Sequence, residues 1–144
     1  MSEEEEGSAV IELVWVVILL LVPLLWIVLS VFEVQSGAYG VTTAARAAGR
    51  AYALAPTDAE GRSAATAAAR QALVDQGLPG DAPLTVEVTC SPYPNCHSGT
   101  SVITVRVASR VDLLVPDVLG GGRPTFALDA THTVPIGQYQ EVDP

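Results

Sequence analysis

An uncharged apolar run near the N-terminus constrains this chain more than any other feature. No residue between Glu12 and Glu33 is charged, and residues 13–32 are interrupted only by one proline and one serine. About 20 consecutive apolar residues are enough to cross a bilayer as a helix. The run is too long for the core of a secretory signal peptide, lacks a preceding basic segment, and is not followed by a small-residue cleavage site. Residues 8–33 are therefore predicted to form a transmembrane helix.

The rest of the chain is long enough for one small domain at most, and its charge is acidic. The 144 residues hold 7 Lys+Arg, all of them arginine, against 16 Asp+Glu, which gives a net charge of −9. A chain without a basic stripe cannot displace counterions from a phosphate backbone, so nucleic acid is excluded as a partner.

The alanine-rich sequence after the apolar run predicts that the helix continues outward through residues 34–55. Arg46 and Arg50 lie one turn apart on one face of it, and Pro56 ends it. Small residues recur at spacings of three and four on this segment: Gly37, Gly40, Ala44, Ala48 and Ala51. Such a stripe lets another helix backbone come close, although alanine is also simply a good helix former, and both interpretations stay open.

A second alanine-rich helix is predicted after Pro56. The sequence "TDAE" is typical of a capping box, with Thr57 as the N-cap and Glu60 reaching back to its amide. Gly77, followed by Pro79, ends the helix. It has few large apolar side chains, so it must pack on another element to be stable.

From Leu84 onward the apolar residues recur with a period of two, which predicts strands with one polar face. The inward positions of three successive strands are Val86, Val88 and Cys90; Ile103, Val105, Val107, Val111 and Leu113; and Phe126, Leu128, Ala130 and Val134. Glycines and prolines in "PDVLGGGRP" connect the second strand to the third. The prediction is an α+β fold. A long transmembrane helix extends outward, and residues 56–144 form a small domain with the alanine-rich helix and a three-stranded antiparallel sheet covered on one side.

The two cysteines, Cys90 and Cys96, lie close together in "CSPYPNC", where prolines and an asparagine favour a tight reversal. A disulfide bond is predicted, which would place this part of the chain outside the cytoplasm. A zinc site is the alternative, but this spacing, with His97 adjacent and no second ligand cluster, matches metal sites poorly.

No catalytic, metal or cofactor site is predicted from the remaining residues. His97 falls in the cysteine loop and His132 on the apolar face of the third strand, and neither has a nucleophile or carboxylate at a useful spacing. "GGGRP" lacks the lysine and the strand–helix context of a phosphate loop.

Glu12 is the residue at which the sequence predicts a specialised role. A carboxylate just inside an apolar span is costly unless it is protonated or paired with a cation, so such groups are candidates for function. Glu12 also follows Gly7 by five residues, and the apolar run begins directly behind it. A glutamate that merely reaches to the membrane surface is the simpler alternative.

The order glycine, "SAVIE" and a long apolar helix resembles the class III signal of type IV pilins and pseudopilins. Together with the alanine–arginine segment 42–51, it makes the chain similar to the TadE/TadG-like minor pseudopilins of the tight adherence (Tad, or Flp) pilus system. The likeness covers the first half of the chain by pattern and the second half by architecture only. The leader departs from related ones in carrying glutamates at 3–6 in place of basic residues, and Leu13 stands where Flp-type signals tend to have tyrosine.

This resemblance implies that residues 1–7 are a cytoplasmic leader and that a prepilin peptidase cuts between Gly7 and Ser8. Glu12 would then act in assembly, by pairing with the new α-amine at Ser8 of a neighbouring subunit. The implied partners are the peptidase, other Tad pilins or pseudopilins, the inner-membrane assembly platform and the lipid bilayer. The protein would be non-enzymatic and single-pass, with its N-terminus in the cytoplasm and its domain outside, within or near the pilus.

Two other function classes are compatible with the sequence. One is a single-pass envelope protein whose exported domain binds a partner and whose leader is never removed. The other is a membrane-tethered hydrolase, which would need a cleft and a base–nucleophile pair that these residues do not supply.

Overall fold

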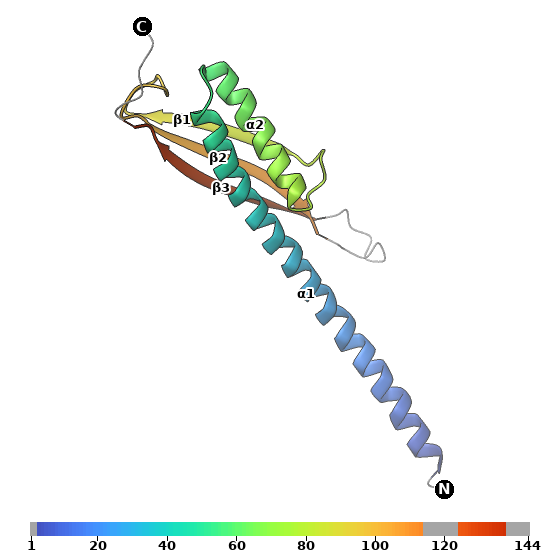
Figure 1. Cartoon of the computed structure of the whole chain (residues 1–144). Coiled ribbons are helices and arrows are strands. Elements are labelled where there is room, and N and C mark those ends of the chain that lie inside the picture. Colours follow the sequence, from blue (N-terminus) through green and yellow to red (C-terminus); the bar gives the residue numbers. More distant parts are fainter. Residues whose placement is uncertain (1–2, 114–123, 138–144) are drawn as a thin grey trace.

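The computed structural model describes residues 3–113 and 124–137, which form two helices packed on one face of a three-stranded sheet (Figure 1). In chain order the elements are α1 (Glu3–Ala53), α2 (Asp58–Asp75), β1 (Leu84–Ser91), β2 (Val102–Asp112) and β3 (Thr125–Pro135). The α+β architecture expected from the sequence, with its long first helix, second helix and small sheet, is confirmed. Most of the expected connection between β2 and β3, residues 114–123, lies outside the described residues.

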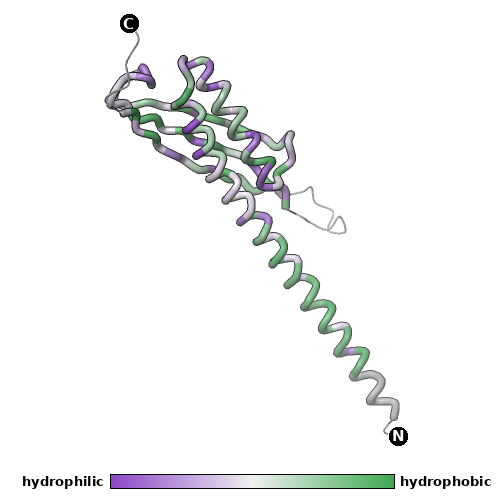
Figure 2. Tube along the Cα trace, in the orientation of Figure 1, coloured by the Kyte–Doolittle hydropathy of each residue, from purple (hydrophilic) through white to green (hydrophobic). Residues whose placement is uncertain are grey.

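Helix α1 is a single helix of 51 residues, and its first half projects away from the rest of the chain (Figure 1). The segment Ala9–Ala53 is long and apolar enough to cross a membrane, and hydrophobic residues dominate its projecting half (Figure 2). Pro23 lies inside the helix without ending it. The helix begins at Glu3, earlier than the position after Gly7 that the sequence favoured, because glutamates are good helix formers and suit the positive end of the helix dipole.

The second half of α1 packs on α2 through small residues. Gly37, Gly40, Ala44 and Ala48 are buried as the stripe predicted, whereas Ala51 is only half-buried. Tyr52 continues the stripe instead and is fully buried at the end of the helix. On α2 the facing residues are also small, and they are Gly61, Ala65, Ala69 and Ala72. Gly37 faces the sheet instead, where its Cβ would meet Val111 and Leu128, and α2 is the helix that packs against this half of α1.

The two ends of α2 follow the predicted signals in part. The backbone amide of Glu60 donates to the Thr57 hydroxyl at 3.3 Å, so Thr57 is the N-cap. The Glu60 side chain does not accept from the Thr57 amide in the described structure, so the second half of the predicted capping box is not formed. At the other end Gly77 has a left-handed backbone with φ of 89°. The Gly77 amide donates to Val74 and the Leu78 amide to Leu73, which is the hydrogen-bond pattern of a Schellman motif.

The three strands form an antiparallel meander in the order β1-β2-β3. Alternate residues of β2 point to the helices, and Ile103, Val105 and Val107 are fully buried. Helix α1 lies across β2 and β3: a Cβ atom at Gly37 would meet Leu128 and Val111, and one at Gly49 would meet Val134 and His132. The apolar face of the sheet is thus covered by the helices, as predicted.

Phe126 departs from its predicted place in the core. It is paired with Val111 on the helix-facing side of the sheet, yet it is 46% exposed. It lies at the start of β3, which is an edge strand. The next inward residue of that strand, Leu128, is the one that contacts α1. Among residues 3–113 and 124–137, no helix or strand covers the Phe126 side chain beyond that contact.

Candidate functional site

Glu12 lies on the projecting half of α1, where its side chain is exposed. The large apolar residues around it are also exposed: Val10 and Ile11 are each 62% exposed and Leu13 is 63% exposed. In the described part of the chain, ion pairs join Arg62 to Asp58 and Arg106 to Asp129, so none involves Glu12. Its carboxylate must find water, a proton or a cation from another molecule.

The predicted cleavage residues, Gly7 and Ser8, lie in the first turns of the same helix. Gly7 precedes Glu12 by about 7.5 Å along the helix axis, at roughly 1.5 Å per residue. The structure therefore keeps the two predicted features on one element and close together. A protease that needs an extended substrate would have to unwind this first turn, which glycine favours because it is a weak helix former.

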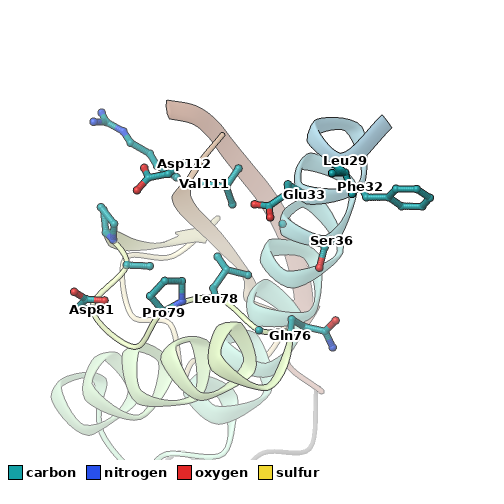
Figure 3. A pocket seen from close by; sticks show the side chains of 15 residues that line it. Leu29, Phe32, Glu33, Ser36, Gln76, Leu78, Pro79, Asp81, Val111 and Asp112 are labelled. Carbon is teal, nitrogen blue, oxygen red and sulfur yellow. The ribbon is translucent and has the colours of Figure 1, made fainter. Parts of the chain in front are cut away.

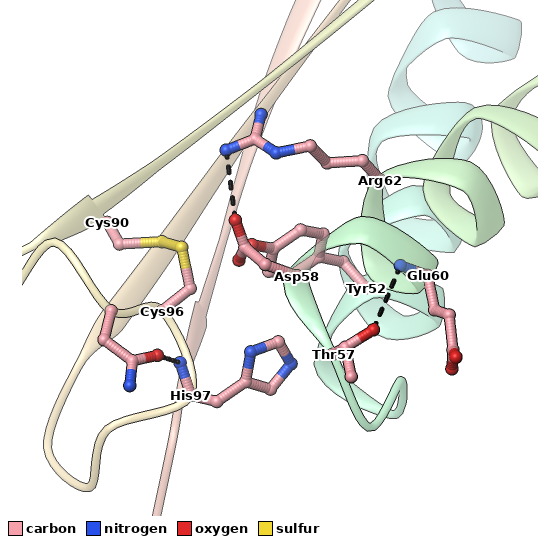
Figure 4. Close-up of polar contacts among 9 residues, drawn as sticks. Tyr52, Thr57, Asp58, Glu60, Arg62, Cys90, Cys96 and His97 are labelled. Atoms are coloured by element: carbon pink, nitrogen blue, oxygen red, sulfur yellow. Dashed lines mark hydrogen bonds and ion pairs between the residues drawn. A yellow bond between two sulfur atoms is a disulfide. The ribbon is translucent and has the colours of Figure 1, made fainter.

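A second group of polar contacts surrounds the corner between α1 and α2 (Figure 4). Cys90 and Cys96 are joined, with their Cα atoms 5.3 Å apart, so the predicted pairing is present in the structure. His97 directly follows Cys96, and its ring stacks on Tyr52 with centroids 5.5 Å apart and planes at 21°. The Tyr52 hydroxyl donates to Asp58, which also pairs with Arg62. The disulfide loop, the end of α1 and the start of α2 thus meet at one tyrosine.

Burial raises the pKa of Tyr52 above its ordinary value, and the hydrogen bond to the Asp58 carboxylate raises it further. Tyr52 consequently stays protonated and acts as a donor at any physiological pH. In the sequence, only its position four residues after Ala48, at the end of the small-residue stripe, distinguishes this residue.

A groove lies where α1 leaves the domain (Figure 3). It has a volume of about 660 Å³ and lies between α1, the loop from α2 to β1, and the end of β2. Three carboxylates line it, one from each wall: Glu33, Asp81 and Asp112. Glu33 points from α1 towards the end of β2, where Asp112 lies (Figure 3). We call this the acidic groove. Sequence reasoning missed it because the three residues are far apart in the chain.

The walls of the acidic groove are fixed by hydrogen bonds. The Arg70 guanidinium donates to the carbonyls of Gly80 and Ala82 at 3.0 and 2.6 Å, on either side of Asp81. The Ser109 hydroxyl donates to the Pro83 carbonyl at 2.8 Å. One arginine, Arg110, also lines the groove, so carboxylates outnumber guanidinium groups there. This arrangement suits a cationic or basic partner.

Among the described residues, no group of three or more His, Cys, Asp and Glu side chains is arranged to hold a metal ion. His132 lies on the inward face of β3 against Gly49, where the sequence placed it. Comparisons with protein-family models, with curated proteins and with solved structures find no match to this chain.

Proposed function

We propose that this chain is a minor pilin or pseudopilin that a prepilin peptidase processes after Gly7 and that acts in assembly of a Tad-type pilus. The observation that carries the proposal is Glu12. It is a carboxylate in a membrane-length apolar helix whose residues around it are exposed, it follows a glycine by five residues, and it forms no ion pair within the described chain.

A partner for the Glu12 carboxylate could come from a second copy of the chain. A charged side chain near the middle of a bilayer costs about 2.5–3.5 kcal/mol on insertion scales, and somewhat less near the edge. Cleavage after Gly7 would create an α-amine at Ser8, on the same helix as Glu12. Within one helix these two groups lie at different levels, but helices of neighbouring copies offset by about one turn would bring amine and carboxylate together. Pairing would then compensate both charges and fix the register between subunits.

The shape of the chain supports side-by-side packing of α1 helices. The sheet and α2 cover one side of its second half, whereas the large apolar residues between positions 10 and 25 are exposed. Exposed apolar residues run continuously along that first half. In an assembly, neighbouring helices could cover them after they leave the lipid.

The proposed orientation places the N-terminus in the cytoplasm and residues 34–144 outside. The pairing of Cys90 with Cys96 supports it, since disulfides persist mainly in oxidising compartments. The short leader holds four of the acidic residues, and acidic residues have little influence on topology.

A second candidate function is a single-pass envelope protein whose exported domain binds a basic partner. The acidic groove favours it, because such a groove is open and presents three carboxylates to a ligand. This candidate requires neither cleavage at Gly7 nor any role for Glu12.

The two candidates are separated by the N-terminus and by a pair of matched variants. In cells that contain the peptidase, the proposal expects mass spectrometry of the membrane-extracted protein to find an N-terminus at Ser8. Glu12→Gln should impair pilus formation while the protein still inserts. Glu33→Gln, at the other end of the same apolar run, should leave processing at Ser8 intact. A mature chain that still begins at Met1 or Ser2 would favour the envelope protein.

A further inference from the structure

One face of the second half of α1 is not covered by α2 or the sheet. Its residues recur about one turn apart and are Tyr39, Thr42, Thr43, Arg46, Arg50 and Leu54, which directly follows the helix. Tyr39 is 71% exposed and Leu54 is 84% exposed. We call this face the outer stripe.

The arginines are the residues of the outer stripe whose polar groups still need hydrogen-bond partners. The hydroxyls of Thr42 and Thr43 donate to the carbonyls of Ala38 and Tyr39 in the preceding turn, each at 2.9 Å. These hydroxyls are already satisfied, so covering the threonines would cost little desolvation. The guanidinium groups of Arg46 and Arg50 are the groups that a covering surface must satisfy.

Neither arginine has a carboxylate partner among the described residues, where the ion pairs are Arg62–Asp58 and Arg106–Asp129. Two like charges one turn apart on a helix also repel each other. The chain carries this repulsion although its Asp+Glu residues outnumber its arginines by 16 to 7. The two guanidinium groups together form a basic face on an acidic protein.

Lipid headgroups are too far away to be the partner of this face. At about 1.5 Å per residue, Arg46 lies roughly 20 Å beyond Glu33 along the helix, and Arg50 roughly 25 Å. The headgroup layer extends only about 5–8 Å beyond the hydrocarbon on each side. A protein surface that carries carboxylates is the remaining complement.

The acidic groove has that chemistry and belongs to the same chain. It presents Glu33, Asp81 and Asp112, and none of the three takes part in an ion pair within the described chain. Arginine binds carboxylates through two parallel hydrogen bonds, which favours it over lysine at such a contact. Leu29 and Phe32 line the same groove and could contact the apolar ends of the outer stripe.

We propose that the outer stripe of one copy docks in the acidic groove of a second copy, with Arg46 and Arg50 on its carboxylates. The inference rests on the proposed function, because the arginines of one copy reach the groove of another only when the two are offset by roughly 20 Å along α1. Copies at one depth in a bilayer cannot adopt this offset. Subunits a few steps apart in a filament can, since the Ser8–Glu12 pairing offsets adjacent copies by only about one turn. The outer stripe and the acidic groove are different surfaces of each copy. The contact is therefore heterologous and can repeat from copy to copy.

The absence of lysine from the chain allows a direct test. Arg46→Lys or Arg50→Lys introduces a side-chain amine that a zero-length carbodiimide can couple only to a carboxylate in contact with it. Assembled pili containing a mixture of isotopically labelled and unlabelled copies are cross-linked and digested. The expected product joins position 46 or 50 of one copy to Glu33, Asp81 or Asp112 of another. The same variants in membranes without assembly should not give this product.

Arg62→Lys is the matched control, because Arg62 lies 3.4 Å from Asp58 of its own chain. It should link within one copy and so confirm that the reagent works. If the amine at 46 and 50 couples to another protein, or to no groove carboxylate while the control links, the inference is overturned.

Charge exchange gives an independent measurement. Arg46→Asp with Arg50→Asp should reduce the number of assembled copies at least tenfold, and so should Asp81→Arg with Asp112→Arg. All four changes in one chain should restore most of the assembly, and failure to do so when each pair reduces it would contradict the contact. The N-terminus of the same samples reports on processing: a Ser8 terminus without a groove link refutes the docking alone, whereas an intact leader refutes the proposed function.

Discussion

Removing the hydroxyl of Tyr52 tests the account of how the domain is joined to its long helix. Tyr52 is fully buried, donates to Asp58 and stacks on His97. Tyr52→Phe retains the ring and removes only the hydrogen bond. A hydrogen bond to a charged group contributes about 1.5–3 kcal/mol, but Asp58 is half-exposed and keeps Arg62, so we expect a loss of about 1–1.5 kcal/mol. For a domain of this size that lowers Tm by roughly 4–10 °C.

The stacking contact is measured separately with His97→Ala, which should cost about 0.5–1.5 kcal/mol. Because the hydroxyl and the ring face make different contacts, Tyr52→Phe and His97→Ala should be additive within about 0.5 kcal/mol. Tyr52→Ala should cost about 3–5 kcal/mol and should show coupling to His97→Ala, since it removes the ring itself.

The assay is thermal unfolding of the detergent-solubilised full-length protein, followed by circular dichroism with the disulfide intact in every variant. Tyr39→Phe is the matched control, because Tyr39 is 71% exposed, and its effect should stay within about 0.5 kcal/mol. If Tyr52→Phe is as neutral as this control and Tyr52→Ala costs no more than a surface substitution, the proposed joint does not exist.

Three further predictions concern Gly37, the pKa of Tyr52 and the Cys90–Cys96 disulfide. Gly37→Ala should lower the unfolding free energy by about 1 kcal/mol in the same assay: its Cβ would overlap the Leu128 side chain and lie 2.8 Å from Val111 Cγ1, and this overlap outweighs the gain of about 1 kcal/mol in helix propensity. An unchanged or higher Tm would show that the side chains of β2 and β3 move aside at little cost. Because the folded state raises the pKa of Tyr52, stability should be complete below its ordinary value of 10.0 and should decline as pH rises above it, and Tyr52→Phe should flatten that decline. Mass mapping without reductant should find Cys90 joined to Cys96, and reduction should cost about 2 kcal/mol for so short a loop; two free thiols in the exported protein would contradict the pairing.

Local signals in the sequence were sufficient to predict the helices and strands of the fold. The cap at Thr57, the left-handed turn at Gly77 and the alternation along β2 each depend on residues that are neighbours in the chain. Covalent geometry and helix or strand periodicity fix such features before any long-range contact forms. The small-residue stripe predicted close helix packing for the same reason.

Features that depend on distant residues could not be predicted in this way. The inward position of Phe126 follows from alternation, but its exposure depends on where α1 ends its contact with the sheet. The pairing of Ala48 and Tyr52 with α2, rather than with another subunit, depends on how the chain turns at Pro56. The acidic groove depends on three elements meeting, and no pattern in the sequence marks that meeting.

The predicted assembly site at Glu12 differs from the local features and from those that depend on distant residues of the same chain. Its proposed partner belongs to another copy. The sequence identifies Glu12 by its charge and by its distance from Gly7. The structure adds that the apolar side chains next to Glu12 on α1 are exposed. A contact between copies must be tested on the assembled protein.

The most direct measurement uses the native chain, whose processed form would have a single amine, at its N-terminus, because it contains no lysine. Assembled pili made from labelled and unlabelled copies are treated with a zero-length carbodiimide, and the linked peptides are identified by mass spectrometry. The account predicts an amide between the amine of Ser8 in one copy and the carboxylate of Glu12 in another. A mature N-terminus at Met1 or Ser2, or a Ser8 amine that never couples to Glu12 of a neighbouring copy, would contradict it.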